Sequence, residues 1–368
     1  MSGRVYNFSA GPACLPRPVL EQAQKDIGEI FDSGMSVLEL SHRGKEFDRI
    51  TAETFEACHA VTKIPDDYTV FWMQGGATSQ CYLVPANFLA HDRTADYFQT
   101  GKWAKDSIKE APLYGKCHIC ASGEDTNYST IPTGNAVSYS DNPVYVHFTA
   151  NNTIMGTEFH ADPSPPDGSF LVCDASSNIF SKPIDITKYG LIYAGAQKNL
   201  GPAGITLVIA RKDLIAEPVR DLPTMMQFRK HAEKEGRFNT PPTFGVYLMG
   251  RVFRWITEQG GLEAMAQRNQ ARANILYTFL DSQDFYIPHA TPESRSNMNI
   301  TFRCPTPELD KAFITGATER GLRELKGHRS IGGMRASMYN AFPTEGAEAL
   351  VSYMKEFARQ HASAAASS

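Results

Sequence analysis

The chain alternates short apolar runs with helical or turn-rich stretches between residues 68 and 210. Five runs have the length and composition of buried strands, at 68–73, 144–148, 169–174, 191–196 and 205–210. This alternation predicts an α/β fold in which a mostly parallel central sheet carries helices on both faces. The gap between the last two runs is too short for a parallel crossover, so we expect one of that pair to be antiparallel to the rest.

From about residue 245 the pattern changes to long helices, at 245–259 and 262–281, separated by Gly260 and Gly261. Glycine is common just after a helix because it adopts the left-handed conformation easily. The length of 368 residues also exceeds the roughly 250 to 300 that a single hydrophobic core usually serves. We therefore predict a large domain at 16–261 and a smaller C-terminal α/β domain at 262–368, which also takes in residues 1–15.

The smaller domain continues with elements of both kinds. We expect a strand at 298–303, a helix at 307–321, a turn-rich strand pair within 327–339 and a last helix. In that last helix the apolar residues share one face, which predicts packing against a core. Residues 363–368 are a low-complexity alanine and serine tail.

Composition narrows the class of protein. With 36 basic and 40 acidic residues the net charge is −4, which argues against a general nucleic-acid-binding surface. No uncharged run approaches the roughly 18 residues of a membrane span, and the first residues contain no apolar signal segment. We therefore expect a cytoplasmic protein that binds neither nucleic acid nor membrane.

The cysteines point to the same compartment. There are 7, an odd number spread along the chain, which suits free thiols better than a disulfide framework. The single CxxC, Cys117 to Cys120, has no second pair and lies in an expected strand, where residues three apart face opposite ways. We therefore expect no metal site.

Polar residues follow the expected strands, at the carboxyl edge where open α/β sheets bind ligands. Gly75 and Gly76 form a small-residue turn into a helix, which can hold a phosphate or can be a plain tight turn. Asp174 ends one buried run and Lys198 follows another, 24 residues later. Such a pair can hold a pyridine ring between acid and amine. Taken singly, the aspartate can also be a turn cap and the lysine a solvated turn residue.

Nine segments, in order along the chain, together resemble the phosphoserine aminotransferase family of fold-type I pyridoxal-phosphate enzymes. The resemblance runs from about Tyr6 to about Phe357, and the segment "ASGEDTNYSTIP" and the C-terminal tail contribute nothing to it. The segments are "NFSAGPACLP", "LSHRGKEF", "QGGATSQ", "TGKWAK", "NNTIMGTEF", "DASSNIFSKPID", "YAGAQKNLGPAG", "NTPPTFGVY" and "GHRSIGGMRASMYNAFP".

The resemblance implies pyridoxal 5'-phosphate as the cofactor and assigns roles around it. Lys198 forms the covalent link and Asp174 keeps the pyridine nitrogen protonated, while Trp103 stacks on the ring and Thr153 contacts its phenolic oxygen. The cofactor phosphate is held by Gly76, Ala77 and Gln197, and by Asn239 and Thr240 from the neighbouring subunit of a homodimer. Without the resemblance, Trp103 can stack on the ring, although large aromatic residues are more often core residues than cofactor contacts.

The same resemblance assigns the substrate contacts. Arg335 binds the α-carboxylate, and two His-Arg pairs hold the substrate phosphate or the side-chain carboxylate of glutamate; the pairs are His42 with Arg43 and His328 with Arg329. Guanidinium groups suit both anions because they bind carboxylates and phosphates with two hydrogen bonds. A single His-Arg pair can also be a solvated turn.

The implied activity is a ping-pong transamination in serine biosynthesis, from L-glutamate to 3-phosphohydroxypyruvate. One alternative is another fold-type I enzyme, such as a cysteine desulfurase-like lyase, which needs a reactive cysteine on a mobile loop. Cys304 follows an expected strand and fits that requirement poorly. A second alternative is a binding or scaffold protein that keeps the fold without the chemistry.

Overall fold

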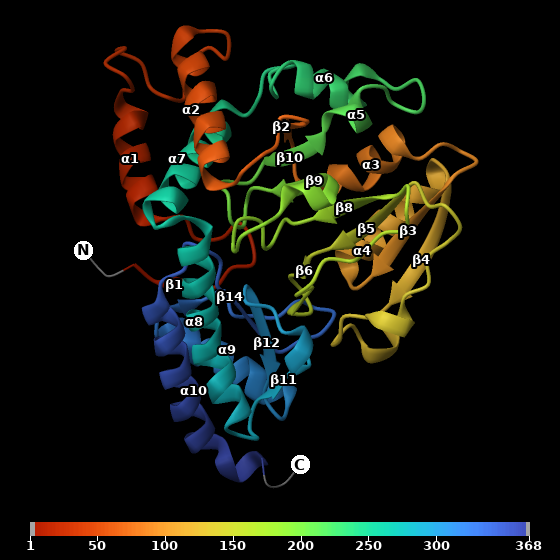
Figure 1. Ribbon diagram of the computed structural model, residues 1–368. Coiled ribbons are helices and arrows are strands. Elements are labelled where there is room, and N and C mark those ends of the chain that lie inside the picture. The colour runs from red at the N-terminus through yellow and green to blue at the C-terminus, as the bar shows by residue number, and fades with distance from the viewer. Residues whose placement is uncertain (1–3, 366–368) are drawn as a thin grey trace.

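A computed structural model describes residues 4–365, and its centre is a seven-stranded sheet (Figure 1). The strand order is β2-β10-β9-β8-β5-β3-β4. The bounds are β2 Tyr68–Gln74, β3 Thr94–Gln99, β4 Lys116–Ser122, β5 Tyr145–Thr149, β8 Phe170–Asp174, β9 Tyr189–Gly195 and β10 Ile205–Arg211. Strand β10 is antiparallel to both of its neighbours, whereas the other pairs are parallel. The five predicted strands and the single antiparallel one are confirmed.

Within the central sheet, strand β3 was not predicted from the sequence. Its apolar run is interrupted by Asp96, which is fully buried. Ser140 satisfies this carboxylate, donating from its backbone N–H at 2.8 Å and from its hydroxyl at 2.6 Å. A buried polar group needs such partners. Cys117 and Cys120 lie on β4 as expected, and all seven cysteines are free.

Helices cover both faces of the sheet, as predicted. On one face α1, Arg17–Gly28, α2, Lys45–Val61, and α7, Thr243–Glu258, pack with Val70 and Trp72 of β2. On the other face Phe71 and Met73 pack with four shorter helices. These are α3 Gln80–Phe88, α4 Lys102–Glu110, α5 Lys212–Ile215 and α6 Phe228–Glu233. Successive strand residues therefore enter different cores, which is why β2 reads as a continuous apolar run.

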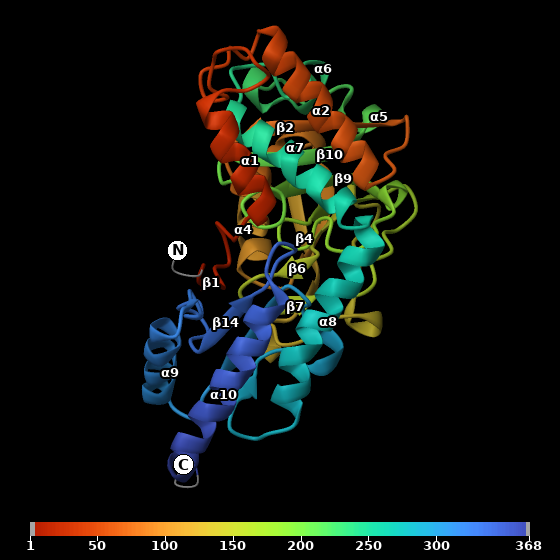
Figure 2. The ribbon, with the colours of Figure 1, turned by 90° about the vertical axis from the view of Figure 1, so that its left-hand side faces the viewer.

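The C-terminal part forms a second layer below the sheet in Figures 1 and 2. Helix α8, Gly261–Asp281, begins in the large core at Leu262 and ends in a separate core. Its start follows Gly260, which has φ 96°, so the predicted glycine stop is confirmed. Phe8 belongs to the second core, and β1, Tyr6–Asn7, pairs with β13, Leu322–Arg323. The numerical domain limits stay a prediction.

A small antiparallel sheet and two helices complete this part. The sheet has the order β11-β12-β14, with bounds Ile287–Pro288, Asn299–Arg303 and Met334–Ser337. The helices are α9, Pro307–Glu319, and α10, Thr344–Ala365. Of the alanine and serine tail, residues 363–365 continue α10 and 366–368 lie outside the described residues. A short hairpin, β6 Asn151–Asn152 with β7 Thr157–Glu158, follows β5.

Candidate active site

The carboxyl ends of the parallel strands bring the predicted residues to one edge of the sheet. Strands β2 and β9 both run antiparallel to β10, so they share the direction of β8, β5 and β3. Each of these strands contributes at or just after its end. The contributions are Gly76 and Ala77 after β2, Trp103 after β3, Thr153 after β5, Asp174 at the end of β8, and Gln197 and Lys198 after β9.

Lys198 lies at the centre of this edge, and its side chain is largely buried. Its Nζ donates to the Thr153 hydroxyl at 2.6 Å. Burial lowers the pKa of Lys198 to about 8, the nearby Asp174 carboxylate raises it, and the Arg335 guanidinium lowers it again. The amine therefore loses its proton far more readily than a surface lysine does, which suits a nucleophile or a proton carrier.

Asp174 is 9% exposed and ends β8. Its Oδ1 accepts from the Ser176 backbone N–H at 3.0 Å, so the carboxylate does cap the turn. Burial raises the pKa of Asp174, whereas Ser176 and Lys198 lower it. Beside it in register, Thr149 has a buried hydroxyl with no partner among the described residues. A polar ligand atom at this position would satisfy that group.

The turns after β2 and β9 form a small-residue cradle. Gly75 has φ 93°, and a methyl group added at Gly76 would meet nothing within 4 Å, so the backbone there is open to a ligand. A methyl group at Gly195 would lie 2.6 Å from Gln197 Oε1, which is buried without a partner in the described part of the chain. The open glycine backbone, whose N–H groups donate, fits the phosphate end of the expected cofactor, and the Gln197 amide would contribute there through the N–H groups of Nε2.

Trp103 lies in the first turn of α4 and is 37% exposed. A core tryptophan would be covered, so the exposed indole favours the stacking role over the packing role. Together, the Lys198 amine, the Asp174 carboxylate, the unsatisfied Thr149 hydroxyl and this indole fit the ring end of pyridoxal phosphate.

The N-terminal segment "NFSAGP" covers this site, and sequence reasoning gave it no role. A methyl group at Gly11 would lie 3.3 Å from Lys198 Cγ, and Ala13 N donates to Gln197 O at 2.8 Å. Tyr339 holds the segment from the other side, because its hydroxyl donates to Ala10 O at 2.9 Å. No local sequence pattern predicts contacts between residues so far apart in the chain.

The predicted basic residues divide into two groups. Arg335 reaches the site, where its Nη1 lies 3.5 Å from Thr153 O. His328 lies near it: burial lowers the pKa of His328, and the charges of Arg335 and Arg329 lower it further. His42 and Arg43 are not part of this cluster. They line a different cleft with Asp48 and Arg237, by the start of α2, which Figures 1 and 2 place far from β14.

Asn239 and Thr240 precede α7. The Asn239 amide donates to Gln74 Oε1 of the same chain at 2.6 Å, at the end of β2 and directly before the glycine turn. The structure of one chain thus places Asn239 beside the start of the cradle, while Thr240 is exposed.

Two further features bear on the alternatives. Cys304 is 2% exposed in the second core, and burial raises the pKa of its thiol, so it lacks the accessibility of a reactive cysteine. Among residues 4–365, no helix is long and apolar enough to cross a membrane.

Comparison with known proteins agrees with this geometry. Residues 5–350 match the family model for aminotransferase class-V. The chain is 48% identical to the phosphoserine aminotransferase of Herpetosiphon aurantiacus, covering 96% of this chain and 98% of the relative, and 46% identical to that of Halalkalibacterium halodurans, covering 97% and 99%.

Solved structures give the same result. Phosphoserine aminotransferase from Bacillus circulans subsp. alkalophilus matches with a TM-score of 0.95 at 45% identity, over 97% of this chain and 99% of that one. The pyridoxal-phosphate-bound enzyme from Trichomonas vaginalis matches with a TM-score of 0.92 at 38% identity, over 96% and 100%. This chain belongs to the class-V aminotransferase family, among the phosphoserine aminotransferases.

Proposed function

We propose that this chain binds pyridoxal 5'-phosphate and transfers the amino group of L-glutamate to 3-phosphohydroxypyruvate, giving O-phospho-L-serine and 2-oxoglutarate in serine biosynthesis. The observation that carries the proposal is the position of Lys198 just after the end of β9, where its amine donates to the Thr153 hydroxyl at 2.6 Å and Arg335 Nη1 lies 3.5 Å from the Thr153 carbonyl oxygen. The relatives that share this fold over nearly the full chain are named for that activity. The free cysteines and the modest net charge support a cytoplasmic location.

The cofactor, when bound, supplies an aldehyde that accepts the amino group and a ring that takes up the electron pair released at the substrate α-carbon. Asp174 would keep a proton on the pyridine nitrogen, and Trp103 would stack on the ring. The backbone at Gly76 and Ala77 and the amide of Gln197 would hold the phosphate. All of these residues lie at or just after the ends of strands of the central sheet, which is a rigid support.

Lys198 has two tasks in this scheme. Its amine would hold the cofactor through the aldehyde, and it would carry the proton of the substrate α-carbon. A pKa of about 8 suits the second task, since a group titrating near neutral pH both accepts and returns a proton readily. The Thr153 hydroxyl, 2.6 Å from Nζ, orients the amine.

Substrate selection depends on the basic residues. Arg335 binds the α-carboxylate that every substrate carries, and His328 with Arg329 binds the distal phosphate or carboxylate. His42 and Arg43 lie by another cleft of the chain, so their contribution to substrate requires a second subunit. We therefore propose a homodimer with shared active sites, in which Asn239 and Thr240 likewise reach the cofactor phosphate of the partner.

The activity is tested by following the absorption band of the bound cofactor. The holoenzyme should absorb as a lysine-linked cofactor, lose that band on addition of L-glutamate, and regain it with 3-phosphohydroxypyruvate. Bleaching without recovery by this acceptor would reject the proposed substrate, and a chain without the band would be a binding protein. Lys198→Ala should still bind cofactor and should not complete turnover.

The shared site is tested separately by mixing two defects. Chains with Lys198→Ala are co-expressed with chains carrying both Asn239→Ala and Thr240→Ala. If the two residues serve the partner's site, each hybrid dimer has one intact site, and random pairing restores about a quarter of wild-type activity. No recovery in purified hybrid dimers would reject the sharing of sites and leave the transaminase activity standing.

A further inference from the structure

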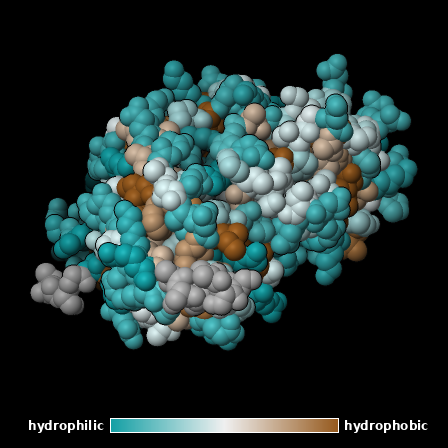
Figure 3. Space-filling view, turned by 90° about the horizontal axis from the view of Figure 1, so that it is seen from below, coloured by the Kyte–Doolittle hydropathy of each residue, from teal (hydrophilic) through white to brown (hydrophobic). Residues whose placement is uncertain are grey.

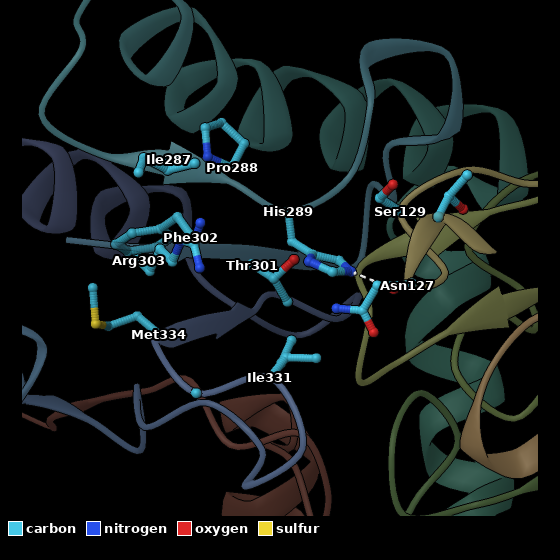
Figure 4. A pocket seen from close by; sticks show the side chains of 12 residues that line it. Asn127, Ser129, Ile287, Pro288, His289, Thr301, Phe302, Arg303, Ile331 and Met334 are labelled. Atoms are coloured by element: carbon cyan, nitrogen blue, oxygen red, sulfur yellow. Dashed lines mark hydrogen bonds between the residues drawn. The ribbon is translucent and has the colours of Figure 1, made fainter. Parts of the chain in front are cut away.

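The segment 121–132, which took no part in the family resemblance, forms one wall of a cavity of about 310 Å³ (Figure 4). The opposite wall comes from the small sheet and from the turn before β14. The first wall contributes Thr126, Asn127 and Ser129. The second contributes Ile287, Pro288, His289, Thr301, Phe302, Arg303, Ile331, Gly332 and Met334.

Hydrogen bonds hold the two walls together at one end. His289 Nε2 donates to the carbonyl oxygen of Asn127 at 3.0 Å, drawn as the dashed line in Figure 4, and Thr291 N donates to Ser129 O at 3.0 Å. Because a carbonyl only accepts, Nε2 carries the hydrogen and Nδ1 of neutral His289 stays an acceptor. The imidazole is thus fixed at the edge of the cavity.

The charge on the residues that line the cavity is positive and is carried by Arg303. None of the residues that line it is acidic, and Arg303, at the end of β12, is exposed and makes no ion pair or side-chain hydrogen bond in the described part of the chain. Burial and the Arg303 charge lower the pKa of His289. A guanidinium without a carboxylate partner favours a carboxylate ligand, whereas neutral His289 offers the cavity only the acceptor Nδ1.

The rest of the cavity is lined mainly by apolar side chains, and part of their surface is exposed. Ile287 is 42% exposed, and Figure 4 shows it with Pro288 on one side of the cavity and Ile331 on the other. An exposed isoleucine at the mouth of a cavity gains from being covered. We propose that this cavity binds a small carboxylate with a short apolar body, with the anionic end at Arg303 and the body between Ile287 and Ile331, against Asn127 of the opposite wall.

Both walls are bonded to segments that carry expected site residues. Ile331 N and Gly332 N donate to His328 O at 3.0 and 2.9 Å, and His328 is one of the expected substrate contacts. On the other wall, Glu124 pairs with Lys105 at 2.5 Å, and Lys105 belongs to α4, the helix that carries Trp103. A carboxylate that bridges the walls therefore restrains both segments at once.

The test uses the holoenzyme and 6,6,6-trifluorohexanoate as the probe, with binding followed by fluorine NMR. Arg303→Gln removes the charge, and Arg323→Gln is the matched control, because Arg323 is an exposed strand-end arginine outside the cavity. Asn127→Gly alters the opposite wall, since glycine keeps the backbone at φ 51° and the carbonyl that holds His289. Unchanged melting temperatures and turnover in these variants confirm an intact fold.

We expect Arg303→Gln to weaken binding by about tenfold or more, since a charged hydrogen bond is lost, and Asn127→Gly to weaken it severalfold. Arg323→Gln should bind as wild type does, and 6,6,6-trifluorohexylamine should not bind. Equal affinity in wild type and Arg303→Gln would place the probe elsewhere, for example at Arg335, and would overturn the site. Equal binding of the amine would overturn the preference for anions, and an effect of Arg303 without one of Asn127 would overturn the bridging of the walls.

Discussion

Replacing Asp174 by Asn and Arg335 by Leu should move the pKa of Lys198 in opposite directions. Burial is the main cause of the lowered value, about 8, and the two charged neighbours modify it with opposite signs. Asp174→Asn removes a negative charge that stabilises the ammonium, so the pKa falls. Arg335→Leu removes a positive charge that destabilises it, so the pKa rises.

The size of the effect decides whether Lys198 is reactive at neutral pH. With a pKa of about 8, roughly one amine in eleven is neutral at pH 7, whereas with the ordinary value of 10.5 the fraction is roughly one in three thousand. Charges in contact range move a neighbouring pKa by roughly 1 or more. The reactive fraction at pH 7 should therefore rise several-fold in Asp174→Asn and fall roughly tenfold in Arg335→Leu.

The assay is competitive labelling of the cofactor-free protein with trace acetic anhydride between pH 6 and 11. Mass spectrometry of the Lys198 peptide gives its labelling rate at each pH, and the peptide of the exposed Lys63 corrects for reagent decay. The inflection should lie near pH 8 in wild type, lower in Asp174→Asn and higher in Arg335→Leu. Coincident inflections in all three proteins, or shifts of the same sign, would refute the electrostatic argument.

Three further predictions concern charge, the cradle and the core. Arg329→Leu should raise KM for 3-phosphohydroxypyruvate about tenfold more than for acceptors without phosphate, because a charged hydrogen bond to the phosphate is lost. Arg335→Leu should impair all acceptors, and equal losses from Arg329→Leu would indicate a folding defect. Gly195→Ala should displace the Gln197 amide, 2.6 Å from the added methyl group, and should speed cofactor loss in dialysis by tenfold or so; unchanged retention would remove Gln197 from the cradle. Burial lowers the pKa of His147 to about 3. Below pH 6.5 the unfolded chain therefore binds a proton that the folded chain does not bind, and the free energy of unfolding decreases as the pH is lowered. In urea unfolding, the loss of unfolding free energy between pH 7 and pH 5 should be about 2 kcal/mol larger in wild type than in His147→Phe; equal losses in both proteins would show that His147 is not the cause.

The sequence by itself determined the class of fold and the order of its elements. Strands buried on both faces are apolar throughout, so β2, β5, β8, β9 and β10 were visible as runs, and the short link after β9 required an antiparallel partner. Strand β3 was not predicted because Asp96 interrupts its apolar run. Only the tertiary structure supplies the two hydrogen bonds from Ser140 that allow this aspartate to be buried in a strand.

The chemistry of the site was also visible in part. Lys198 and Asp174 stand at strand ends, and parallel strands bring their carboxyl ends to one edge whatever the loops do, so their proximity follows from topology. What each residue does was supplied by the family resemblance. The lowered pKa of Lys198 follows from burial, which no local pattern contains.

Only the tertiary structure decided which distant segments meet at that edge. The cover of Lys198 by Gly11, the bond from Tyr339 to Ala10 and the cavity between segment 121–132 and the small sheet join parts of the chain that share no periodicity. The structure also separated two His-Arg pairs that look alike in sequence, placing His328 by Arg335 and His42 by another cleft. Periodicity specifies which face of an element is buried, whereas the partner that covers that face depends on packing across the whole chain.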